Sequence, residues 1–123
     1  MATAHRIAPI FSVRDLGVAL GHYQRLGFAV RAYTAGYGYG FASRDGVEIH
    51  LHVMPDHDRR PSSAYLFVDD ADALAAAWHS TGVEVLHTPQ DTDWGQREGA
   101  VVDPDGNIIR FGSPMKAASS GVA

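Results

Sequence analysis

The chain has 123 residues, 46% of them hydrophobic, and its 10 Lys and Arg against 14 Asp and Glu give a formal net charge of −4. This length suits one compact domain and excludes a two-domain enzyme. The mild acidity argues against a phosphate-tracking surface, so nucleic acid is not an expected partner. The absence of cysteine excludes a disulfide framework and a thiolate metal site, and makes the cytoplasm the simplest compartment. The first residues carry too few apolar side chains for a signal peptide or a membrane span, so no membrane association is expected.

The sequence contains one internal repeat. Residues 13–30 return 55 positions later as residues 68–85. The matched positions are Asp15 with Asp70, Tyr23 with Trp78, and Gly27 with Gly82. Farther along, the offset becomes 60, because the second copy carries five extra residues between His87 and Gly99. A repeat of this length predicts two copies of one supersecondary unit.

The first copy begins with an apolar run of strand length at residues 7–13, followed by a helix. Asp15 is the expected N-cap of that helix, because a short carboxylate accepts the free N–H groups of the first turn. Gly27 stands where a left-handed residue ends a helix, and Tyr23 is expected to pack the helix on a sheet. Three β-rich runs follow, at residues 28–34, 38–43 and 47–53.

The second copy repeats this order after a polar linker at about residues 55–63. A strand is expected at residues 64–68, then a helix capped by Asp69 or Asp70 that ends at Gly82 and packs through Trp78. Further strands are expected at residues 83–87, 98–102 and 107–111. We therefore predict a single domain over residues 1–123, with module one at about 6–54, module two at about 64–113 and a flexible tail at 114–123.

Each module is a βαβββ unit, which places the fold in the α+β class. One helix covers only one face of each sheet, so the two modules cannot close their cores independently and must pair. If the sheets curl toward each other, their uncovered faces line a cleft, and alternate residues on each strand decide what the cleft binds.

This arrangement resembles the vicinal oxygen chelate superfamily of glyoxalase I, extradiol dioxygenases, fosfomycin-resistance enzymes and bleomycin-resistance proteins. The motifs that carry the resemblance are the helix exit Leu26-Gly27-Phe28 and the turn Asp103-Pro104-Asp105-Gly106-Asn107, and it covers about residues 6–113. It implies two tandem βαβββ modules that form a curved mixed sheet around a cleft.

The metal enzymes of this superfamily take four ligands from equivalent strand positions. The resemblance carries those positions onto Ala8, His50, Ser63 and Arg110, of which only His50 is a plausible ligand, because a methyl group cannot donate and a guanidinium repels a cation. We therefore expect no metal and no cofactor. The alternative is a metal-dependent enzyme of the glyoxalase or dioxygenase type that uses His50.

His50 and His52 share one face of their strand, so they could hold an ion together if a third ligand came from Glu48 or His57. The simpler interpretation is that both line a wet cleft, and acid–base use of one of them is a further alternative. The remaining histidines are expected at the surface; they are His5, His22, His79 and His87.

Aromatic side chains are the most informative feature. Tyr33, Tyr37, Tyr39 and Phe41 cluster in module one, and Trp94 lies in the polar expansion of module two. A Trp in a polar loop either packs on the protein's own surface or faces a ligand. The string 94–98, Trp-Gly-Gln-Arg-Glu, resembles the bleomycin-resistance branch, in which a Trp of this loop and an aromatic near the third strand flank the drug's flat rings. The matching positions are Trp94 and Tyr39.

We therefore predict a metal-independent small-molecule binding protein. It would sequester an aromatic, cationic antibiotic or metabolite, bleomycin-like or another aromatic natural product, without breaking bonds. The residues expected to bind the ligand are Tyr37, Tyr39, Phe41, His50, His52, Asp93, Trp94 and Arg110. No catalytic residue is expected, although an enzyme of the same superfamily, a lyase, isomerase or dioxygenase, stays open. The resemblance implies a homodimer with the cleft at the subunit boundary.

Overall fold

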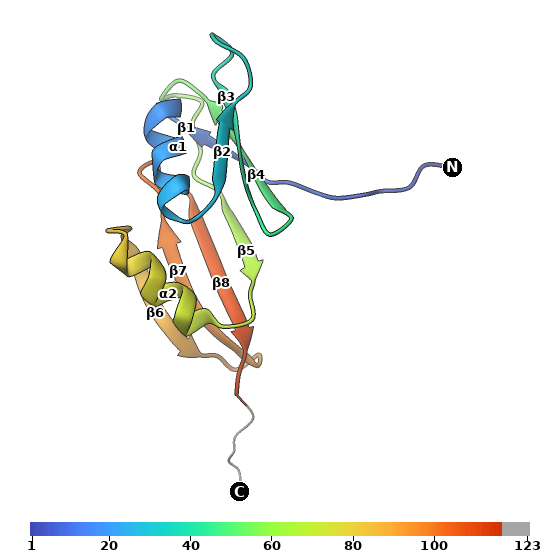
Figure 1. The fold of residues 1–123 in the computed structure, drawn as a ribbon. Coiled ribbons are helices and arrows are strands. Elements are labelled where there is room, and N and C mark those ends of the chain that lie inside the picture. Colours follow the sequence, from blue (N-terminus) through green and yellow to red (C-terminus); the bar gives the residue numbers. More distant parts are fainter. Residues whose placement is uncertain (117–123) are drawn as a thin grey trace, which may run out of the picture. The chain divides into compact units, whose positions relative to one another are not determined.

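The computed structural model describes residues 1–116, and its elements follow the order β-α-β-β-β twice (Figure 1). The first copy consists of β1 (Ile10–Val13), α1 (Leu16–Arg25), β2 (Ala29–Ala32), β3 (Tyr39–Arg44) and β4 (Val47–Val53). The second consists of β5 (Ser63–Phe67), α2 (Ala71–Ser80), β6 (Val85–Asp91), β7 (Gln96–Val102) and β8 (Ile108–Pro114). The predicted α+β class and the two tandem modules are confirmed. Of the predicted tail, Pro114 belongs to β8, and residues 117–123 lie outside the described residues.

The strands form two four-stranded mixed sheets with the same topology, β1-β4-β3-β2 and β5-β8-β7-β6. In each sheet the first strand pairs parallel with the last strand of its copy, and the other pairs are antiparallel. The chain divides into two compact units, Met1–Ser62 with Pro104–Asn107, and Ser63–Asp103 with the chain from Ile108 onward. Each unit holds one sheet and the helix that packs on it.

Both helices begin and end as the repeat predicts. Oδ1 of Asp15 accepts the N–H of Val18 at 2.9 Å, and Oδ1 of Asp70 accepts the N–H of Ala73 at 3.0 Å, which decides between Asp69 and Asp70. Gly27 and Gly82 follow the helices with φ of 88° and 81°. A side chain there would strain the backbone, which explains the glycine in both copies.

Each helix buries an aromatic ring against its sheet, as expected. Trp78 lies edge-on to Phe111 with ring centroids 5.0 Å apart, and both rings are buried. Tyr23 packs between Phe11 and Phe28 in the other unit.

One histidine differs from the prediction. His22 was expected at the surface, yet its side chain is 3% exposed and lies edge-on to Tyr23 with centroids 5.0 Å apart. The buried face of α1 is therefore wider than its apolar residues alone indicate, because an imidazole presents a flat ring to a neighbouring aromatic. His5 and His79 are exposed as expected, and His87 is half-buried.

The turn between β7 and β8 belongs to the first compact unit. The buried Asn107 donates from Nδ2 to the carbonyl of Ser12 and accepts the N–H of Ser62 at Oδ1, both at 2.9 Å. Asp105 accepts the N–H of Arg14 at 3.0 Å. The turn therefore does more than reverse the chain direction: it also forms hydrogen bonds with segments that are far away in the sequence.

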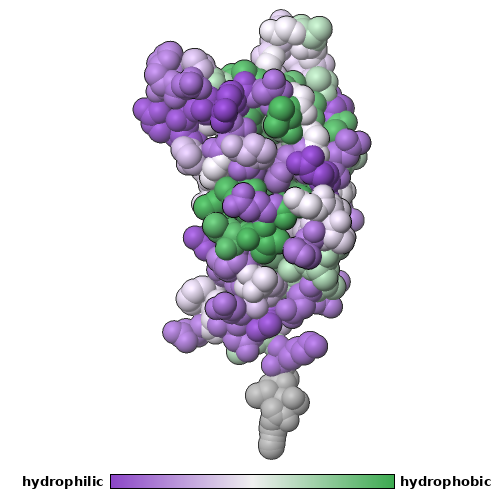
Figure 2. Space-filling model, turned by 90° about the vertical axis from the view of Figure 1, so that its left-hand side faces the viewer, coloured by the Kyte–Doolittle hydropathy of each residue, from purple (hydrophilic) through white to green (hydrophobic). Residues whose placement is uncertain are grey.

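Figure 2 shows that hydrophobic surface on the viewed side is confined to patches between hydrophilic side chains. Within residues 1–116, none of the helices has the length and hydropathy needed to span a bilayer.

Candidate functional site

In the first unit, the sheet face opposite α1 collects aromatic and titratable side chains. A Cβ atom at Gly40 would lie within 3.2 Å of Leu16 and Leu20 of the helix, so Gly40 faces α1. Its neighbours Tyr39 and Phe41 therefore face the other way. The register places His52 opposite Tyr39 and His50 opposite Phe41. Four of the predicted binding residues thus lie on one face.

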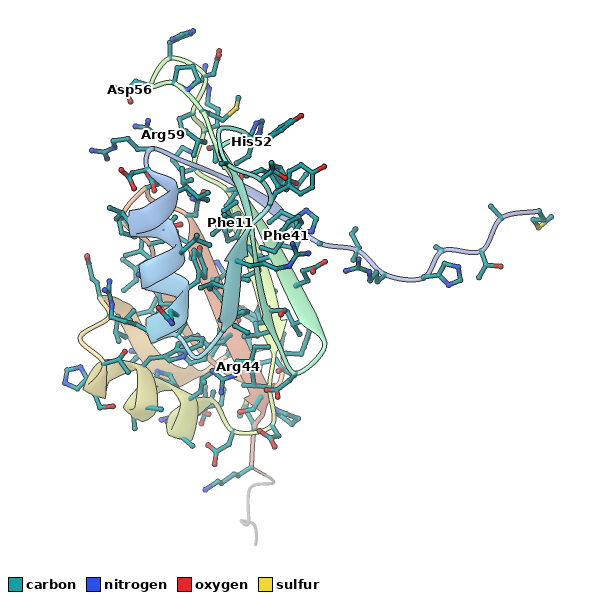
Figure 3. All side chains as sticks on the ribbon, turned by 45° about the horizontal axis from the view of Figure 1, so that its top comes forward. Phe11, Phe41, Arg44, His52, Asp56 and Arg59 are labelled. Carbon is teal, nitrogen blue, oxygen red and sulfur yellow. The ribbon has the colours of Figure 1, made fainter. Side chains whose placement is uncertain are left out.

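Five rings on this face line a cavity of about 320 Å³, namely those of Tyr33, Tyr37, Tyr39, Phe41 and His52. Phe41 and His52 are labelled in Figure 3. Neighbouring rings stand nearly perpendicular, at 78° for Tyr33 with Tyr37 and 79° for Tyr33 with Phe41. Edge-to-face pairs of this kind hold aromatic walls in place and leave ring faces open. Tyr33 was not among the predicted binding residues, although its place in the aromatic cluster was a usable signal.

A charged neighbour modifies one of these walls. The guanidinium carbon of Arg31 lies 4.2 Å from the centroid of Phe41, at cation–π distance. One face of Phe41 is therefore covered by the protein's own cation.

A chain of polar contacts runs along the same sheet face. The Tyr39 hydroxyl lies 2.8 Å from Nδ1 of His50, and Nε2 of His50 lies 3.2 Å from Oε1 of Glu48. Glu48 also binds Arg6. Hydrogen bonds from Arg6 and then His50 hold the pKa of the Glu48 carboxyl below its usual range. Burial, with Glu48 nearby, raises the pKa of Tyr39.

The donors present do not fit the metal site of the superfamily's metal enzymes. Both ring nitrogens of His50 already have partners within its own sheet. Ala8 offers no ligand atom, and Arg110 carries a permanent charge. His57, one of the suggested third ligands, contacts Asp58 in the linker. Within residues 1–116, no three His, Asp or Glu side chains gather closely enough to hold an ion.

In the second unit, Trp94 lies at the tip of a hairpin that is longer than predicted. β6 runs to Asp91 and β7 starts at Gln96, so the extra residues extend the hairpin, with register shifts in the pairing between Val85 and Gln90. Thr92 closes the tip, since its N–H donates to the carbonyl of Gln96 at 3.0 Å and its Oγ1 accepts the N–H of Gln96 at 3.2 Å. A defined turn therefore presents the indole.

The Trp94 ring is 67% exposed, and its Nε1 donates to Oε1 of Glu98 at 3.3 Å. Glu98 is only 7% exposed, and its other oxygen lies 3.8 Å from Nη1 of Arg110. The buried carboxylate thus links two predicted binding residues, Trp94 and Arg110, on one side of the second sheet. Glu98 was not among the predicted binding residues, because alternation along a strand does not show whether a carboxylate is buried.

The acidic residues of the hairpin behave differently from each other. Asp91 lies 3.5 Å from Nη1 of Arg97, whose Nε also contacts Asp72 at 3.2 Å. Asp93 is exposed. Asp91 is exposed as well, but its charge is already paired with that of Arg97.

Two tandem βαβββ modules, each with one helix packed on a four-stranded mixed sheet, define the architectural class of this protein. A family model described as "Glyoxalase/Bleomycin resistance protein/Dioxygenase superfamily" matches residues 4–111. The chain belongs to this superfamily.

Individual relatives agree with this assignment. A curated "Bleomycin resistance protein" of Klebsiella pneumoniae is 28% identical over 112 residues, which are 84% of this chain and 87% of the relative. The crystal structure of a bleomycin resistance determinant encoded on the transposon Tn5 superposes with a TM-score of 0.79 at 24% identity, over 91% of this chain and 99% of that one. A bleomycin-binding protein complexed with bleomycin gives a TM-score of 0.76 at 24% identity, over 89% and 98%. These two structures show the same fold, and the assignment of individual side chains to a ligand stays a prediction.

Proposed function

We propose that this protein is a metal-independent binding protein that sequesters an aromatic, cationic antibiotic or metabolite by stacking, in the manner of a bleomycin-resistance protein. The curated relative and the bleomycin-bound structural neighbour support this choice of ligand class. The lack of cysteine suits a reducing cytoplasm as its place of action.

The observation that carries the proposal is the exposed but anchored indole of Trp94. An exposed Trp holds a large apolar ring in water, and covering that ring with a flat ligand removes its apolar area from water. The hydrogen bond to the buried Glu98 restrains the ring while its faces stay open. A restrained ring loses less conformational entropy on binding than a mobile one.

The aromatic cavity of the first unit supplies the same kind of surface. Stacked or edge-on aromatic pairs contribute about 0.5–1.5 kcal/mol each beyond the area they bury. Tight binding needs several such contacts, and Tyr37 and Tyr39 would supply two of them in this unit. Bond breaking is not required by any of them.

A second copy of the chain completes the proposed binding site. In each unit, apolar side chains on the sheet face away from the helix stay exposed, among them Ile10 opposite His50 and Phe67 opposite Gly112. A homodimer would cover these side chains and place the binding cleft at the subunit boundary. Size-exclusion chromatography with light scattering measures this directly.

The test is a calorimetric titration of the chain, Trp94→Ala and Trp94→Phe with bleomycin. We expect Trp94→Ala to weaken binding at least about 10-fold, as truncation of a stacked interface aromatic does. Trp94→Phe should recover part of the affinity, because it restores a ring face but lacks the N–H that bonds to Glu98. In both variants the remaining Trp78, buried against Phe111, reports an intact fold through its fluorescence. Unchanged affinity in a folded Trp94→Ala would contradict the proposal.

A further inference from the structure

The polar chain beside the aromatic cavity has a direction. It starts with the permanent cation of Arg6, continues through the Glu48 carboxylate and the His50 imidazole, and ends at the Tyr39 hydroxyl. All members but the exposed Arg6 are half-buried, so water competes only partly for these bonds. Of these four residues, Tyr39 alone is among the described residues that line the cavity.

The groups at the two ends of this hydrogen-bonded series decide which of its atoms carry the protons. Glu48, with its depressed pKa, is an ionised carboxylate at neutral pH and can only accept hydrogen bonds. The ring nitrogen that faces it, Nε2 of His50, must therefore donate. When the His50 ring is neutral it has one donor and one acceptor, so Nδ1 is then the acceptor and the Tyr39 hydroxyl donates its proton to it.

The Tyr39 hydroxyl has only one proton, and this bond uses it. Its oxygen keeps a second lone pair, so toward a ligand in the cavity that Tyr39 lines it can accept but not donate. We infer that Tyr39 selects ligands that present a hydrogen-bond donor, an aromatic N–H or an amide N–H, at the edge of the ring held in the cavity. The inference rests on the proposed function only in taking this cavity as part of the ligand site.

The tautomer of His50 that is protonated at Nδ1 is disfavoured by its contact with Glu48. If Nδ1 of His50 carried the proton, the lone pair of Nε2 would face the Glu48 carboxylate at 3.2 Å. Two acceptors at that distance repel each other, and the partly buried setting strengthens the repulsion. Glu48 therefore acts on the ligand through His50, as a positioning residue.

The first experiment reads the proton positions without any ligand. Long-range 1H–15N NMR of the histidine rings, at about pH 8 so that an ordinary imidazole is neutral, distinguishes the two tautomers and the imidazolium. We expect His50 in the form protonated at Nε2 and not at Nδ1. A signal from the Nδ1-protonated form, or from a doubly protonated ring, overturns the inference.

The second experiment compares indole with 1-methylindole, two flat rings of nearly equal size of which only indole has an N–H. Added methyl surface favours 1-methylindole in any purely apolar cavity. A hydrogen bond to Tyr39 should instead make indole bind about 3- to 10-fold more tightly, measured by NMR titration of the aromatic resonances.

Two variants assign the effect to the right atom. Tyr39→Phe keeps the ring and removes the acceptor, so the preference for indole should vanish. Tyr33→Phe removes a hydroxyl from another wall of the same cavity, at a residue outside the predicted binding set, and the preference should stay. Equal binding of the two indoles, a preference that survives in Tyr39→Phe, or binding of neither indole each contradicts the inference. If the chain discriminates between the indoles but does not bind bleomycin, the proposed function fails and the inference stands.

Discussion

The hydrogen bonds of Asn107 allow a quantitative prediction for Asn107→Ala. The side chain is 0% exposed and satisfies two main-chain groups, the carbonyl of Ser12 and the N–H of Ser62, both at 2.9 Å. Leaving a buried polar group without its partner costs about 1–3 kcal/mol. Because Ser62 is exposed and Ser12 is half-buried, water can partly replace the lost bonds, so each loss falls near the lower limit. We expect a total of about 2–3 kcal/mol.

The assay is urea unfolding followed by circular dichroism, with the midpoint shifted and the slope with denaturant unchanged. Ser80→Ala is the control, since it removes a hydrogen bond from an exposed hydroxyl at the end of α2 and should change stability by less than about 0.5 kcal/mol. If Asn107→Ala lowered the free energy of unfolding by as little as the control does, the reasoning would be refuted. The hydrogen bonds of the turn would then make no measurable contribution to stability.

Three further changes test other contacts. Gly112→Ala should destabilise the fold by about 1–3 kcal/mol, because the new Cβ would lie 2.1 Å from the Tyr65 hydroxyl. Combining it with Tyr65→Phe should recover part of the lost free energy of unfolding. If the effects of the two substitutions were strictly additive, this clash would be excluded. Asp15→Ala and Asp70→Ala should each cost about 1 kcal/mol through a lost N-cap, and a neutral result in thermal melts would remove the capping role. Burial, with Glu98 nearby, raises the pKa of Tyr65. The folded protein therefore holds the phenol proton more tightly than the unfolded chain does. The stability that results is fully present below about pH 10 and is lost as the pH rises through the pKa of the folded state. Urea midpoints above pH 10 should fall less steeply in Tyr65→Phe, and identical slopes would show that the phenol does not contribute.

The features that the sequence predicted are those set by neighbouring residues. Helix caps, the left-handed Gly27 and Gly82, and the buried Trp78 all depend on interactions within a few residues or on helical periodicity. The repeat doubled the evidence for each, since every element had to fit both copies. The element order and the fold class followed from this.

The features that the sequence missed depend on strand pairing and on long-range contacts. Alternation showed that Glu48 and His50 share a face, but only the pairing of β3 with β4 brings Tyr39 within hydrogen-bond distance of His50. The burial of Glu98 depends on its neighbours in other strands. His22 is a separate case: a polar ring at the edge of a helix face can pack inward or outward, and the spacing of the apolar residues does not show which, whereas the structure places it edge-on to Tyr23.

The most direct test of the central claim is a titration of the wild-type chain with bleomycin after exhaustive treatment with a chelator, with elemental analysis of the protein before and after. Stacking without a resident ion predicts binding of full affinity by a metal-free chain, and recovery of the drug with its mass unchanged. Binding that appears only after a divalent metal is added to the protein, or a drug recovered in altered form, would contradict the account.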